Sequence, residues 1–266
     1  MGWWSHFINE GSLALIALAL FVAQVLAREL GSLTHRLVVG ATDDPPEEAS
    51  DKGFIQSGVL GLLALLIAFT FGMAVNRYET RRDMVVAEAN ALGTAEMRVQ
   101  LLEAPQGAQL AQMLHAYART RLAYGLAGAG DKPALVESSA KQRTALQTAT
   151  LSALVPVRTT PLAPFVGAAI NSVLDVGAER EATLSATLPV TILAALVVYI
   201  LLTAGVLGYS LTGVRSRHRV ATGIVFALLT MAILLILDLD RPQGGTIRTD
   251  QTPMSQLVAG FPPAGG

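Results

Sequence analysis

The sequence predicts an all-α integral membrane protein with four transmembrane helices and an extramembrane helical bundle inserted between the second and the third. Three observations predict this class. The 266 residues are 52% hydrophobic with a mean hydropathy of +0.49, which exceeds the usual range of soluble domains. Four stretches are apolar over about 20 residues, the length that a helix needs to cross about 30 Å of hydrocarbon. No stretch alternates apolar and polar residues as a half-buried strand does.

The four predicted spans are residues 8–27, 54–75, 187–211 and 219–237. The first ends in Val25-Leu26-Ala27, which resembles a signal-peptide cleavage site, but it lacks a positively charged leader and is interpreted as a retained span. Trp3 and Trp4 precede it, as is typical of the membrane interface. We therefore expect residues 1–75 to hold the first two spans and residues 187–237 the last two.

The segments between the spans are polar. Residues 28–53 contain clustered acidic residues and the pair Pro45-Pro46, which predicts a loop because proline interrupts a helix. Divalent-cation binding is conceivable in this loop, but a solvated acidic segment is the more usual use of such charge. Residues 238–266 follow the last span with Pro242 and Gly244-Gly245, and we expect an irregular tail there.

The inserted domain, residues 76–186, is expected to continue directly from the second span. No glycine or proline breaks the chain at Asn76, and Val85, Ala89 and Leu92 fall on one helical face, so one helix is predicted over 54–102. Helical periodicity returns in 108–127, in 133–155 and from 162 to the third span. Glycines at 125–130 and prolines at 156, 161 and 164 separate these helices.

Several function classes are disfavoured by composition. The chain has no cysteine and a net charge of −1, and its four histidines are far apart in sequence, so thiol chemistry, a nucleic-acid partner and a histidine metal site are not expected. The segment from Gly208 to Gly213 is neither a nucleophile elbow nor a phosphate-binding loop. We expect no catalytic residue, no cofactor and no metal.

A family resemblance rests on blocks in order along residues 54–254. They include Leu62 to Ala74, Arg77 to Arg82, Glu88 to Thr94, Tyr117 to Arg121, the residues Asn171, Asp175 and Arg180, Gly208-Tyr209 and Asp238-Leu239-Asp240-Arg241-Pro242. With these blocks the sequence resembles the bestrophin-like family of bacterial membrane proteins. The resemblance implies four spans in the bacterial inner membrane and an architecture related to that of bestrophin anion channels, which are oligomers. The acidic residues from Asp43 to Asp51 depart from the basic first loop that is usual in the family.

A face of small residues marks the second span. They recur every three or four positions: Ser57, Gly61, Ala64, Ala68 and Gly72. One interpretation is close packing against another helix, the usual role of such faces in membranes. In the other interpretation, copies of this helix from several subunits surround an oligomer axis, where Thr70 or the rings of Phe69 and Phe71 narrow a pore.

A buried polar network is predicted for the inserted domain and the membrane exit. Asn90, Thr94 and Arg98 recur every four residues, and Glu79 and Arg82 are spaced as an i, i+3 pair. Such residues usually form a solvated surface, but here they coincide with the family blocks. The predicted members are Glu79, Arg82, Glu88, Asn90, Thr94, Arg98, Asn171, Asp175, Arg180, Asp238, Asp240 and Arg241.

The sequence therefore favours a homo-oligomeric, channel-like protein of the lipid bilayer with inorganic anions as permeant species. No span has an ionisable residue at its centre, which disfavours a coupled transporter. The alternative is a non-conducting scaffold or sensor whose helical domain binds a partner. Basic residues flank the spans equally on both sides. Because short loops count most, we expect the loops in the cytoplasm and the helical domain outside.

Overall fold

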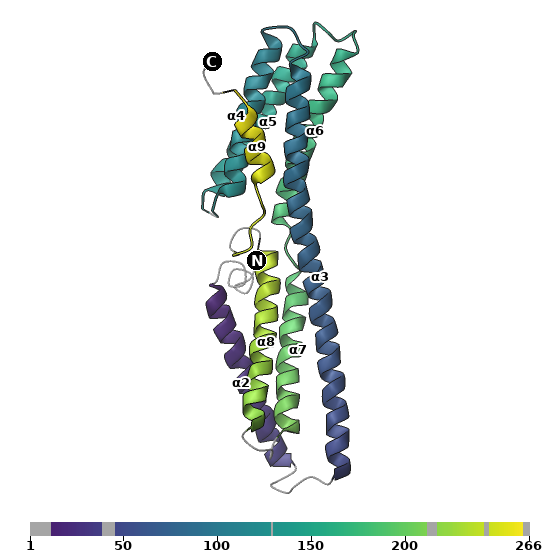
Figure 1. Cartoon of the computed structure of the whole chain (residues 1–266), viewed down its shortest axis with the longest axis vertical. Helices are drawn as coiled ribbons and strands as arrows, with labels where there is room; N and C mark the ends of the chain where they lie inside the picture. Colours follow the sequence, from purple (N-terminus) through teal and green to yellow (C-terminus); the bar gives the residue numbers. More distant parts are fainter. Residues whose placement is uncertain (1–11, 39–45, 129, 212–216, 242–244, 263–266) are drawn as a thin grey trace. The chain divides into compact units, whose positions relative to one another are not determined.

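The computed structural model describes residues 12–38, 46–128, 130–211, 217–241 and 245–262, and every regular element among them is an α-helix (Figure 1). The chain divides into two compact units. Unit 1 contains Met1–Asn76 and Thr187–Arg241, and unit 2 contains Arg77–Ala186 and Pro242–Gly266. Among the described residues, four helices are long and apolar enough to cross a membrane. The predicted all-α membrane class is confirmed.

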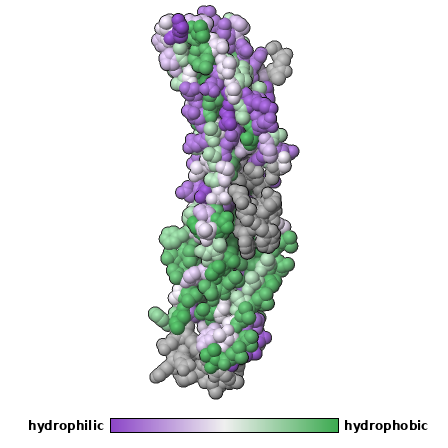
Figure 2. Space-filling view, turned by 180° about the vertical axis from the view of Figure 1, so that it is seen from behind, coloured by the Kyte–Doolittle hydropathy of each residue, from purple (hydrophilic) through white to green (hydrophobic). Residues whose placement is uncertain are grey.

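Unit 1 contains the apolar helices. They are α2 (Leu13–Val38), the first part of α3 (Pro46–Val99), α7 (Val190–Ser210) and α8 (Arg217–Asp240). Apolar side chains cover these helices, whereas hydrophilic side chains gather over unit 2 (Figure 2). One buried polar contact joins two spans: the Gln24 amide of α2 donates to the Thr230 hydroxyl of α8 at 2.8 Å. The sequence analysis did not single out this pair.

Glycines bring α2 and α7 together. A Cβ atom placed on Gly31 would lie 2.0 Å from the carbonyl oxygen of Gly205, and one on Gly208 would lie 2.0 Å from the carbonyl oxygen of Arg28. Each glycine therefore lies directly against the backbone of the other helix. Such small-residue contacts associate helices in lipid, where the hydrophobic effect contributes little.

Unit 2 is built around one apolar core. It contains the second part of α3 together with α4 (Gln106–Leu126), α5 (Lys132–Leu154), α6 (Leu162–Ser185) and α9 (Thr252–Gly260). The buried residues of α3 follow a helical period and meet α4 and α6 residues that are also fully buried, among them Leu92, Val99, Leu114, Tyr117, Val166 and Val173. Prolines stand at the starts of several helices, where the missing N–H has no intrahelical partner to lose. Pro105 precedes α4 and Pro161 precedes α6.

The polar loop predicted for residues 28–53 is shorter than expected. Helix α2 continues to Val38, and α3 already begins at Pro46. The hydroxyls of Ser32 and Thr34 bond back to carbonyls of their own helix, so these polar residues are accommodated in it. Proline is tolerated in the first turn of a helix, so Pro46 starts a helix rather than ending one. Residues 39–45, Trp3, Trp4 and most of the 212–218 turn lie outside the described residues.

The irregular tail predicted for residues 238–266 is also wrong in part. Helix α8 reaches Asp240, and α9 forms over Thr252–Gly260. The Asp250 carboxylate accepts hydrogen bonds from the Thr252 amide at 2.9 Å and hydroxyl at 2.6 Å, which satisfies a donor at the start of α9. The helix is held by tertiary contacts, since Met254 is fully buried and the ring of Phe261 stacks on His115. A nine-residue helix depends on such packing.

Candidate functional site

The small-residue face of α3 lies open in unit 1. No described atom lies within 4 Å of a Cβ placed on Gly61 or Gly72, and Ser57, Ala64 and Ala68 are exposed. These residues do not form the tight backbone contact that Gly31 and Gly208 form. The face is therefore not closely packed on another described helix of its own chain.

The aromatic residues beside this face differ in position. The Phe69 side chain is 67% exposed, and Phe71 is 37% exposed. Thr70 is buried and donates its hydroxyl to the Leu66 carbonyl at 2.8 Å. Thr70 thus points toward its own chain, and of the three predicted pore-narrowing residues only the two phenylalanines reach the exposed surface.

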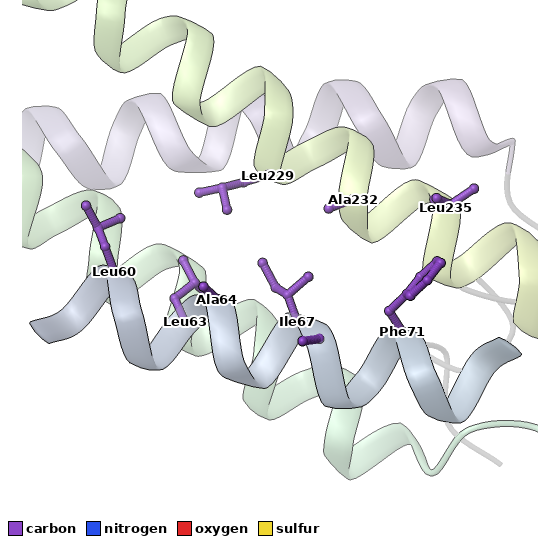
Figure 3. A pocket seen from close by; sticks show the side chains of 9 residues that line it. Leu60, Leu63, Ala64, Ile67, Phe71, Leu229, Ala232 and Leu235 are labelled. Atoms are coloured by element: carbon purple, nitrogen blue, oxygen red, sulfur yellow. The ribbon is translucent and has the colours of Figure 1, made fainter. Parts of the chain in front are cut away.

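An apolar groove of about 440 Å³ lies between α3 and α8 (Figure 3). On the α3 side it is lined by Leu60, Ile67 and Phe71 together with the alanines of the small-residue face, and on the α8 side by Leu229, Ala232 and Leu235. In Figure 3 the labelled leucine, isoleucine and phenylalanine side chains of α3 point toward α8. Because no lining residue is charged or polar, the groove offers dispersion contacts only.

A buried ion-pair network lies in unit 2 with Glu88 of α3 at its centre, and of the predicted residues it contains Glu88 and Arg180. Glu88 is fully buried, and its carboxylate accepts from the Arg121 Nε of α4 at 2.5 Å and from Arg180 Nη1 of α6. Arg121 also donates to Glu181 at 2.5 Å, and Arg143 of α5 donates to the same carboxylate at 3.1 Å. Four helices are joined by these ion pairs. The network is completed from the C-terminal segment, because Arg180 Nη2 donates to Gln251 Oε1 at 2.8 Å.

Burial shifts the acid–base properties of this network. The Arg121 guanidinium lies against two carboxylates, and although burial alone lowers its pKa, these charges raise the pKa above its ordinary value, so Arg121 stays charged. Beside it, burial raises the pKa of Tyr117 to about 12 because the phenolate would lose its hydration. Across the neutral range Arg121 is therefore charged and Tyr117 is neutral.

Several residues predicted for the network lie elsewhere. Glu79, Arg82, Asn90, Asn171 and Asp175 are exposed. The buried face of α3 in unit 2 runs through positions 81, 85, 88, 92, 95 and 99, and that of α6 through 166, 170, 173, 177 and 180, so the five exposed residues lie on the outer faces of these helices. They are corrections to the predicted set.

Two other predicted members, Arg98 and Thr94, are half-buried. Arg98 Nη1 donates to the Phe165 carbonyl at 3.0 Å, and its guanidinium carbon lies 3.9 Å from the centre of the Phe165 ring. Arg98 therefore fixes the start of α6 on α3 through a cation–π contact rather than through an ion pair.

The predicted residues at the membrane exit are buried in unit 1. Both carboxylate oxygens of Asp240 accept from the Leu188 amide, at 3.0 and 2.9 Å, in the segment that leads into α7. Asp240 thus satisfies a backbone donor just before a helix whose first N–H groups lack partners. Asp238, Asp240 and Arg241 all belong to unit 1, and their predicted link to the Glu88 network stays a prediction.

A family model for the Bestrophin-like domain matches residues 16–254 of the chain. The chain belongs to the bestrophin-like family. Among solved structures, this bestrophin-like chain is similar to a bacterial bestrophin homologue from Klebsiella pneumoniae, with a TM-score of 0.62 and 13% identity over 94% of this chain and 100% of that one. A point mutant of a bestrophin homologue from the same organism gives a TM-score of 0.63 at 12% identity, over 91% and 96% of the two chains. No curated protein sequence matches.

These similarities establish the fold of the bestrophin-like chain over nearly its whole length. The residues that the resemblance had pointed to include Glu88, Arg121 and Arg180, which the structure brings together. The sequence analysis missed Glu181, Arg143 and Gln251 as members of the network. Among the described residues, no group of three or more histidine or acidic side chains is placed to hold a metal ion.

Proposed function

We propose that this bestrophin-like protein is one subunit of a homo-oligomeric membrane channel that conducts inorganic anions. Family membership supports a channel-like membrane protein. The observation that carries the proposal is the open small-residue face of α3. No described atom lies within 4 Å of a Cβ placed on Gly61 or Gly72, although faces of this kind are where helices approach each other in membranes. A second copy of the chain is the partner that covers it.

The composition of α3 in unit 1 suits a pore wall better than a coupled transport site. No charged residue lies between Phe54 and Val75, and the exposed Phe69 ring is large enough to narrow an opening. Hydrophobic constrictions gate channels by excluding water, whereas coupled transporters use titratable groups at mid-membrane. We assign Phe69 to the narrow part of the pore.

Electrical recording of the purified protein in planar bilayers tests the proposal. Under a chloride gradient, we expect single-channel currents that reverse near the chloride equilibrium potential. Phe69→Ala should raise the conductance, while Leu202→Ala, an exposed residue of α7, should leave it unchanged. An electrically silent oligomer would overturn the proposal and favour the scaffold or sensor function, and reversal near the cation potential would overturn the anion selectivity.

The side of the membrane on which unit 2 lies is part of the same proposal. By the parity of four spans, the C-terminus shares the side of unit 2, and we place both outside the cytoplasm. A reporter that is active only in the cytoplasm, fused after Gly266, should be inactive. An active reporter would reverse this placement without affecting the channel proposal.

A further inference from the structure

A second cavity belongs to unit 2. It has a volume of about 40 Å³ and is bounded by α3, the end of α4, the start of α5, the last part of α6 and the segment before α9. A single water needs roughly 10–15 Å³, so a small ion fits. Four basic residues line it, and none of its described lining residues is acidic: Arg81, Lys132, Arg180 and Arg248. We call it the Lys132 cavity.

Lys132 is a buried cation without a counterion. The residue is 8% exposed, and no carboxylate among the described residues lies within ion-pair distance of its ammonium group. The Tyr124 ring, with its centre 5.0 Å from Nζ, is the nearest aromatic contact. Burial and the positive charge of Arg180 lower the pKa of Lys132 to about 8, and no acidic group counteracts them. A buried charge in this position is unfavourable unless it is paired.

The neighbouring ion-pair network does not neutralise this charge. It contains three guanidinium groups, those of Arg121, Arg143 and Arg180, but only the two carboxylates of Glu88 and Glu181. The network therefore carries one excess positive charge, and Arg180 belongs both to it and to the cavity wall. Positive charge therefore accumulates around the cavity, and a neutral water molecule inside it would not balance that charge.

The cavity wall is also held in place. Arg180 Nη2 donates to Gln251 Oε1, and Gln251 Nε2 donates to the Thr249 carbonyl at 3.1 Å. A Cβ on Gly125 would lie 2.1 Å from Gln251 Oε1 and 2.9 Å from Arg180 Nη2. The glycine thus lets the amide and the guanidinium sit beside the end of α4, which fixes the cationic groups before any ligand arrives.

We propose that the Lys132 cavity binds one small inorganic anion. The anion supplies the negative charge that the described lining residues do not provide, and it is held by the Lys132 ammonium and the Arg180 guanidinium. The proposal concerns unit 2 alone and holds whether or not the protein conducts ions.

Thermal unfolding of the full-length protein in detergent tests the site at pH 7, where Lys132 is protonated. The probes are sodium chloride and sodium phosphate, each titrated into sodium gluconate at constant ionic strength, with gluconate as the bulky reference anion. We expect a saturable rise in the unfolding midpoint of the wild type with at least one probe. Phosphate alone would identify an oxyanion site, and chloride alone a halide site.

Substitutions separate this site from an anion in the pore. Lys132→Met should abolish the rise, and Lys141→Met, an exposed lysine paired with Glu137, should keep it. Without a binding anion, Lys132→Met should unfold at the same temperature as the wild type or higher, because an unpaired buried charge is removed. If Lys132 had a purely structural role, its replacement by methionine would instead lower the unfolding temperature.

Arg248→Gln provides a second variant if Lys132→Met does not fold, because Arg248 is exposed and its loss leaves the core intact. In this variant, the anion concentration that gives half of the maximal rise in the unfolding midpoint should be at least threefold higher than in the wild type. Isothermal titration of the better probe should give one site per chain. The proposal is overturned by a wild type that does not respond to either anion, or by an equal response in Lys132→Met or in Arg248→Gln.

Discussion

At the scale of single residues, Glu88 has the largest structural role in unit 2. Its carboxylate is fully buried between two guanidinium groups from different helices. Bringing these charges out of water is costly, and the ion pairs offset that cost only while every partner is present. The network is therefore sensitive to the loss of any one charge.

Glu88→Gln should lower the free energy of unfolding by about 3–5 kcal/mol, because it leaves Arg121 and Arg180 buried without their shared counterion. Chemical denaturation followed by circular dichroism measures this change. Glu137→Gln is the matched control, since its exposed i, i+4 pair with Lys141 is worth less than about 0.5 kcal/mol. Equal effects of the two substitutions would show that the Glu88 network does not stabilise the fold.

Lys132 predicts a dependence of stability on pH. Its pKa is about 8 in the folded chain and 10.5 ordinarily, so between these values the unfolded chain binds more protons. The free energy of unfolding contributed by this residue therefore rises with pH over that range. The Tyr124 ring lies beside Lys132, and burial raises the pKa of this tyrosine.

In gluconate buffer, the midpoint of the wild type minus that of Lys132→Met should thus increase from pH 7 to pH 9.5. Lys141→Met serves as the control, because its lysine is exposed and paired. A difference that stays constant over this range would contradict a buried, unpaired ammonium.

The sequence could predict part of this site. Glu88 and Arg180 fall in regions that resemble the family, and both are in the network. Glu79 and Asn90 were predicted to join it from their helical spacing and from the same family resemblance. Their exposure shows that neither signal defines which face of a helix is buried. Gln251 carries no local signal, since it lies 71 residues from Arg180 and only the docking of the C-terminal segment brings them together.

At the scale of elements, the contact between α2 and α7 depends on glycine. Gly31 and Gly208 each face a backbone carbonyl of the opposite helix so closely that no larger residue fits. The small residues of the second span were the predicted packing face, and a contact at Gly31 and Gly208 was not predicted. The small residues of α3 and the glycines of α2 and α7 both suit close helix packing, so residue size alone does not show which of them is packed within one chain.

Gly208→Ala should lower the unfolding midpoint, since the new methyl group would lie 2.0 Å from the Arg28 carbonyl oxygen and the helices must separate. Overpacking of this kind costs about 1–3 kcal/mol. Gly223→Ala in α8 is the matched control. Nothing lies within 4 Å of its Cβ, so the helix propensity of alanine should leave stability unchanged or raise it by up to about 1 kcal/mol. Loss of stability in both variants would point to a general effect of substituting membrane glycines.

The helices were easier to predict than their ends. Long apolar runs specify the spans because the bilayer demands that length, and the periodic faces of α4, α5 and α6 specify their existence. The start of α3 at Pro46 and the whole of α9 were missed. In both cases the local signal was proline, which is compatible with a helix start as well as with a loop.

At the scale of the whole molecule, the open face of α3 predicts the oligomeric state. Native mass spectrometry of the detergent-purified protein should show a multiple of the 27.9 kDa chain. Gly61→Leu should shift the population toward the monomer, because the larger side chain fills the face where a second copy packs, while the monomer itself has space for it. Gly223→Leu in α8 should keep the oligomer. A monomeric wild type would contradict the prediction.

Helix α9 has a consequence for how the chain is made. Unit 2 consists of Arg77–Ala186 and Pro242–Gly266, and the third and fourth spans are synthesised between these two segments. Met254, which is fully buried in the core, and Gln251, which binds Arg180, both leave the ribosome only after those spans. The core of unit 2 therefore stays incomplete while the third and fourth spans are synthesised and inserted into the bilayer. Maturation of this domain is thereby coupled to membrane insertion, and a chain that stalls before its final fifteen residues lacks the helix that closes the core.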